Sequence, residues 1–174
     1  MKGYTLIEFV IYIGIVIIVL LSSLSFAWTI IQDQTKIQLY SEVNYNGSFV
    51  LEKIEYYINR AKDFEDNIYN TNPGTIDLDF ESTPNILIDS YSKEITLGNR
   101  TVNITKLRLT EGTNPAIDLT TDKMDVTNFT INDYSTTNAQ NIGIELTISS
   151  INPDNVQMYA AEKSWTSSAT IKQK

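Results

Sequence analysis

The side chains that could do chemistry in this chain are mostly carboxylates. Asp77 and Asp79 stand two residues apart in a stretch that alternates like a strand, which would place both on one face. Glycoside hydrolysis uses such a pair, with the carboxyl groups about 5–9 Å apart in a cleft. Among 21 acidic residues, however, such pairs also arise by chance. We therefore interpret Asp77 and Asp79 as surface carboxylates and do not expect an enzyme.

A second group of carboxylates is formed by Asp118, Asp122 and Asp125. Carboxylate oxygens are the ligands that calcium prefers, so this stretch could hold a calcium ion in a loop. It lacks the one-three-five spacing and the glycine of an EF-hand. A plain solvated loop is the main expectation, and no metal or cofactor is predicted.

Composition excludes several classes of site. The 174 residues include no cysteine and no histidine, so Cys/His zinc sites, Ser-His-Asp triads, Cys-His dyads and disulfides are impossible within the chain. The net charge of −8 comes from residues 63–174, which hold sixteen acidic and eight basic residues against five of each in residues 1–62. An acidic domain repels phosphates, which argues against direct nucleic-acid binding.

The rest of the chain is arranged around its first 31 residues. They carry only two charges, Lys2 and Glu8, and Phe9–Ile31 is a run of 23 uncharged residues. At 1.5 Å per helical residue this run crosses a bilayer core of about 30 Å, with Trp28 at the interface. A secretory signal peptide ending near Ser22–Ser25 and a plain membrane anchor are two interpretations. Neither gives Glu8 a role.

The segment Lys2-Gly3-Tyr4-Thr5-Leu6-Ile7-Glu8 resembles the processing site of type IV pilins and type II secretion pseudopilins. In that family a membrane peptidase cuts after the glycine and methylates the new terminus with S-adenosylmethionine. The resemblance implies a leader of residues 1–3, cleavage between Gly3 and Tyr4, and N-methylation of Tyr4. It also implies an assembly role for Glu8, which would meet the terminal amine of a neighbouring subunit.

Physical reasoning supports this role of Glu8. A carboxylate near hydrocarbon costs several kcal/mol unless it is paired, and pairing with an amine offsets both desolvation costs and fixes one axial register. The alternative is a glutamate that snorkels to the interface. Two departures from the family favour a minor subunit over the bulk pilin. The first is Ser22–Ser25, where many major pilins have a proline, and the second is the tyrosine at position 4 of this chain.

Beyond the apolar run, the helix is predicted to continue as an amphipathic segment over residues 32–62. The whole helix would run from Tyr4 to Ala61, about 85 Å. Apolar or small residues recur at helical spacing and predict one buried stripe: Ile37, Tyr40, Gly47, Leu51, Ile54, Ile58 and Ala61. The alternative is a break near Gln32–Lys36 that separates a membrane helix from a surface helix.

Residues 63–174 predict a β-rich extracytoplasmic domain. The period changes to two, and Gly98-Asn99-Arg100 predicts a tight hairpin. The fold class expected is α+β, a long N-terminal helix (membrane half plus amphipathic half) packed on a mainly antiparallel β-sheet. The sequence does not decide whether Ile117–Leu119 forms a strand. The predicted strands are Thr75–Phe80, Asn85–Asp89, Glu94–Leu97, Thr101–Ile104 extended by Thr105–Thr110, Val126–Asn132, Asn141–Ser149, Val156–Ala160 and Ser168–Ile171.

The order of helix and Thr/Ile-rich sheet is also similar to that of J-type minor pseudopilins and W-type minor pilins. The resemblance implies a structural subunit of a type IV pilus-like or type II secretion filament. Its partners would be other pilin or pseudopilin subunits, prepilin peptidase, the inner-membrane assembly platform, and membrane lipid before assembly. Before assembly it would be a single-pass membrane protein, and afterwards part of an extracytoplasmic filament. The alternative is a membrane-tethered binding domain with an uncleaved anchor.

Overall fold

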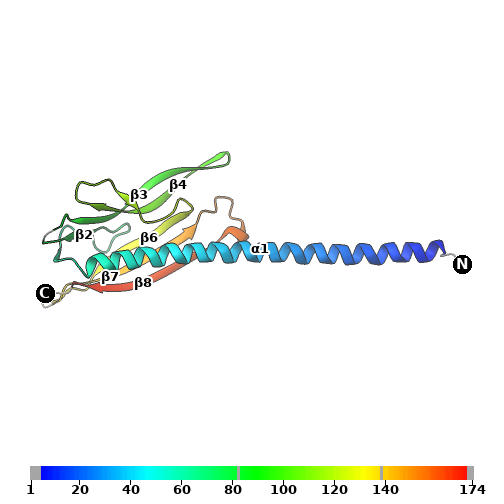
Figure 1. Cartoon of the computed structure of the whole chain (residues 1–174), viewed down its shortest axis with the longest axis horizontal. Coiled ribbons are helices and arrows are strands. Elements are labelled where there is room, and N and C mark those ends of the chain that lie inside the picture. Colours follow the sequence, from blue (N-terminus) through cyan, green and yellow to red (C-terminus); the bar gives the residue numbers. More distant parts are fainter. Residues whose placement is uncertain (1–4, 82, 138, 172–174) are drawn as a thin grey trace.

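One long helix and two antiparallel sheets make up the computed structural model, which describes residues 5–81, 83–137 and 139–171 (Figure 1). Helix α1 (Leu6–Ile58) has 53 residues, about 80 Å at 1.5 Å per residue. It continues without interruption through Gln32–Lys36, so the alternative of two separate helices is wrong. The α+β class predicted from the sequence is confirmed.

The strands follow one another in chain order within each sheet, and all neighbours are antiparallel. The first sheet has the order β1-β2-β3-β4-β5 and the second the order β6-β7-β8, with a single-turn 3₁₀ helix, η1 (Gln157–Tyr159), between β7 and β8. The strands are β1 (Asp63–Phe64), β2 (Ile76–Asp79), β3 (Ile86–Leu97), β4 (Arg100–Glu111), β5 (Ile117–Asp118), β6 (Met124–Asp133), β7 (Asn141–Ser150) and β8 (Glu162–Thr170).

Strands β3 and β4 form a hairpin with twelve paired positions and a two-residue loop, Gly98-Asn99. Gly98 has φ +61°, the conformation that a type II′ turn requires at its first central residue. The hairpin is longer than predicted, because Asn85–Asp89 and Glu94–Leu97 belong to one strand. Arg100 was predicted in the turn and instead begins β4.

The predicted strand Val156–Ala160 is wrong, since Gln157–Tyr159 forms η1. A side-chain loop explains the difference. The amide of Asn152 donates to the carbonyl of Val156 (2.9 Å) and accepts from its N–H (3.0 Å), while Asn155 adopts φ +53°. These bonds take the backbone groups that a strand would need for pairing.

The second half of α1 packs on the sheet β6–β8, with strands β7 and β8 alongside it (Figure 1). The helix buries Val43, Asn46, Gly47, Val50, Leu51, Ile54 and Ile58. Across from it lie the inward residues of the second sheet, Phe129, Ile131, Ile142, Ile144, Leu146 and Ile148. The predicted stripe began too early, because Ile37 and Tyr40 are 68% and 43% exposed. The buried stretch of α1 begins only at Val43.

Helix and sheet come closest where Trp165 of β8 lies against Gly47. A Cβ atom added at Gly47 would stand 2.2 Å from the indole ring. We expect Gly47→Ala to lower the free energy of unfolding by about 1–2 kcal/mol, because overpacking outweighs a helix-propensity gain of about 1 kcal/mol. Chemical denaturation of the detergent-solubilised chain measures the change.

The control uses the same substitution in a Trp165→Ala background. Without the indole ring, only the helix-propensity gain of about 1 kcal/mol is left, so Gly47→Ala should become stabilising. The same sign in both backgrounds would show that Trp165 does not cause the effect.

Candidate assembly site

The first half of α1 extends away from the two sheets (Figure 1). Every residue from Thr5 to Ile31 is exposed. Within the described residues, α1 is the one helix long and apolar enough to cross a membrane. Its apolar side chains therefore need a partner outside this chain, either lipid or another protein surface.

Hydroxyl groups within the apolar half do not interrupt it. Ser22, Ser23, Ser25 and Thr29 each donate to the carbonyl four residues earlier, at 2.9–3.1 Å. A hydroxyl satisfied inside the helix costs little in hydrocarbon. Ser22–Ser25 thus continues the helix.

Glu8 takes part in a capping box at the start of α1. The N–H and the hydroxyl of Thr5 donate to Glu8 Oε2 at 2.8 and 3.0 Å, and the N–H of Glu8 donates to Thr5 Oγ1 at 3.4 Å. The pattern Thr-x-x-Glu is a known helix-start signature, and it was readable in the sequence. Glu8 consequently has a local structural role in addition to the predicted pairing. Gly3 and Tyr4 lie outside the described residues.

The tyrosines of α1 divide between two environments. Tyr45 and Tyr56 are 68% and 49% exposed on the face turned away from the sheet. Tyr57 packs against the core, as does Tyr69 after the helix. Tyr57 and Tyr69 therefore contribute to packing within the chain.

Asp77 and Asp79 lie on one face of β2, as predicted, opposite the buried Ile76 and Leu78. Burial, and secondarily the charge of Asp66, raises the pKa of Asp77. Neither carboxylate lines the hollow between the two sheets that is described below.

Asp118 and Asp122 are held by a lysine that sequence reasoning did not single out. The side chain of Lys106 is 2% exposed, and its ammonium donates to Asp118 Oδ2 at 2.6 Å and to Asp122 Oδ1. Lys93 donates to both oxygens of Asp122 at 2.9 Å. We call these four residues the Lys106 network. The sequence indicates this network only weakly, because Lys106 stands in an alternating strand beside several polar residues.

Lys106, Asp118 and Asp122 remain ionised at neutral pH. Burial lowers the pKa of Lys106, but hydrogen bonds to Asp118 and Asp122 raise it above the usual lysine value. Burial likewise raises the pKa of Asp118, yet bonds from Lys106 and Tyr91 bring it below its usual range. Hydrogen bonds from Lys106 and Lys93 lower the pKa of Asp122.

The third carboxylate of the predicted group lies apart. Asp125 accepts a hydrogen bond from the N–H of Thr105 at 2.8 Å. The Lys106 ammonium sits between Asp118 and Asp122, where a calcium ion would need to bind. In the described part of the chain, no three acidic side chains gather in a way that could hold a metal ion.

The exposed apolar half of α1, with Glu8 at its start, is a surface that lipid or other helices can cover. Asp118, Asp122 and Asp125 each have a hydrogen-bond partner within the chain. Comparisons of the chain with protein-family models, with curated proteins and with solved structures find no match.

Proposed function

We propose that this chain is a minor pilin or pseudopilin, a structural subunit of a type IV pilus-like or type II secretion filament. The observation that carries the proposal is the exposed, uninterrupted apolar half of α1 directly after the segment Lys2–Glu8. A filament built on packed helices needs such a surface on every subunit, together with a domain that leaves it uncovered.

In this proposal the precursor is inserted in the membrane through α1. A prepilin peptidase cuts between Gly3 and Tyr4 and methylates the amine of Tyr4. The assembly platform then moves the chain from lipid into a filament of other pilin-type subunits, with residues 63–174 outside the membrane. Glu8 pairs with the terminal amine of a neighbour, which offsets the cost of both charges in an apolar environment.

The intact mass of the protein purified from its native membranes tests the proposal. The expected species begins at Tyr4 and carries one extra methyl group. Gly3→Ala is the matched variant, which should keep residues 1–3 because the residue before the cut is changed while α1 is untouched. A native chain that begins at Met1 indicates an uncleaved anchor, and one cut near Ser25 indicates a signal peptide. Either result would overturn the proposal.

A further inference from the structure

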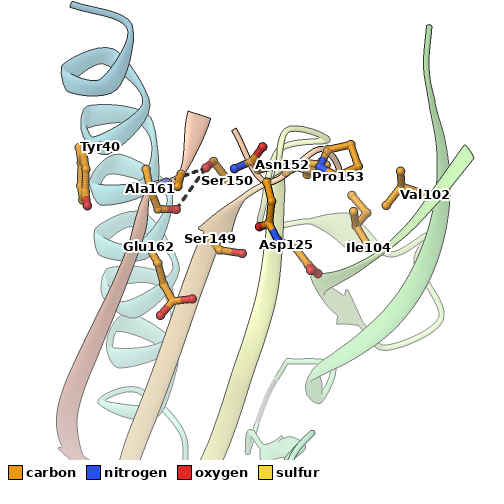
Figure 2. A pocket seen from close by; sticks show the side chains of 13 residues that line it. Tyr40, Val102, Ile104, Asp125, Ser149, Ser150, Asn152, Pro153, Ala161 and Glu162 are labelled. Carbon is orange, nitrogen blue, oxygen red and sulfur yellow. Dashed lines mark hydrogen bonds between the residues drawn. The ribbon is translucent and has the colours of Figure 1, made fainter. Parts of the chain in front are cut away.

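A hollow of about 480 Å³ opens where the two sheets diverge, and Figure 2 shows the side chains that line it. Val102 and Ile104 reach into it from β4, Asp125 from β6 and Glu162 from β8 (Figure 2). Its wall is thus partly apolar, with two carboxylates and no basic side chain among the lining residues that the structure describes.

The edge of β4 beside this hollow has unpaired backbone groups. In β4 the odd-numbered residues turn their backbone groups away from β3: the N–H of Thr105 donates to Asp125, and the N–H of Leu107 faces Thr120 Oγ1. The same alternation turns the N–H and C=O groups of Thr101 and Asn103 outward. Both residues are exposed, and within the described residues no hydrogen bond joins their outward backbone groups to another element.

Outward donors and acceptors at two alternate residues, Thr101 and Asn103, match one type of ligand, an extended polypeptide. A strand added to Thr101–Thr105 would send alternate side chains to the face that carries Val102 and Ile104, and therefore into the hollow. Lysine or arginine fits there best, because its aliphatic stem would lie on Val102 and Ile104 while its charge meets Asp125 and Glu162.

We propose that the β4 edge, Thr101–Thr105, binds an extended segment of a partner protein that has basic residues at alternate positions. Main-chain hydrogen bonds to Thr101 and Asn103 hold the segment, and the carboxylates of Asp125 and Glu162 select its side chains. The inference does not depend on the filament function, since it concerns the sheet domain in either a cleaved or an uncleaved chain.

The test uses the full chain in detergent micelles and the labelled peptide acetyl-Thr-Lys-Thr-Lys-Thr-Lys-Thr-amide. Fluorescence anisotropy should show saturable binding to the wild type. Asn103→Pro removes the outward N–H without taking a bond from β3 and should weaken binding about tenfold or more. The matched variant Asn103→Val keeps that N–H and should bind like the wild type. The double variant Asp125→Asn/Glu162→Gln should also bind more weakly.

Two changes in the peptide keep the test independent of protein folding. The same peptide with N-methylated alternate amides cannot pair with an edge, and the same peptide with glutamate in place of lysine has the wrong charge. Both are expected to bind at least tenfold more weakly. Equal binding of the N-methylated peptide, or equal binding by Asn103→Pro, would overturn the proposal, as would an absence of binding by the wild type.

Discussion

Under the proposed filament function, Glu8→Gln is expected to prevent incorporation of the chain into filaments, whereas Thr5→Ala leaves incorporation close to normal. The two variants separate two roles that meet in one side chain. Glutamine still completes a capping box with Thr5 but carries no charge to pair with an amine. Alanine at position 5 removes the capping hydroxyl, at a cost of about 1 kcal/mol, and keeps the Glu8 charge.

The size of the expected effect follows from the apolar surroundings. An unpaired terminal amine in an apolar environment costs several kcal/mol, and a loss of about 3 kcal/mol corresponds to roughly a hundredfold fall in incorporation. Immunoblots of sheared filaments, normalised to the membrane fraction, measure it. Intact mass should show a Tyr4 terminus for both variants. If Thr5→Ala fails and Glu8→Gln assembles, Glu8 acts as a helix cap and the pairing role is wrong.

The second large effect concerns the Lys106 network. Asp118→Asn/Asp122→Asn removes both charges that face the buried ammonium of Lys106. An uncompensated buried charge is strongly destabilising, so the free energy of unfolding should fall by about 3–5 kcal/mol. Urea denaturation of the detergent-solubilised chain, followed by Trp165 fluorescence in a Trp28→Phe background, provides the measurement.

A third substitution in the same chain is the control. Adding Lys106→Met to the double Asp variant replaces the unpaired ammonium by an apolar side chain of similar length. This change should restore most of the lost stability. Lys106→Met alone should cost less than the double Asp variant, because Asp118 and Asp122 are 35% and 56% exposed and keep Lys93 as a partner. A triple variant as unstable as the double variant would mean that the Asp side chains act by packing.

The long helix was predictable because its signal is carried by many residues at once. No proline occurs before Pro73, and a continuous α1 through Gln32–Lys36 agrees with that. The extent of the buried stripe was not predictable in the same way. Ile37 and Tyr40 have the right spacing, but burial of α1 begins only at Val43. Helical periodicity identifies a face, and only the tertiary fold determines where that face is covered.

Some site residues could be predicted from the sequence, and others could not. The motif Lys2–Glu8 and the Thr5–Glu8 cap depend on neighbours in sequence, so both are present in the sequence itself. The Lys106 network joins residues of β3, β4, β5 and the loop before β6, up to 29 positions apart. Its lysine can be found only once the register of β4 is known. Asp125 was grouped with Asp118 because it is close in sequence, although it binds Thr105 instead.

The exposed apolar half of α1 limits the environments that the chain can occupy. Hiding a large apolar side chain from water is worth about 1.5–3 kcal/mol, so the 19 exposed ones between Leu6 and Ile31 represent tens of kcal/mol. Water is therefore a far less favourable environment for this half of α1 than hydrocarbon or a packed bundle of helices. Hydrocarbon and a packed bundle of helices are nearly equivalent environments for these side chains, so the proposed transfer from lipid to filament would be close to balanced in free energy.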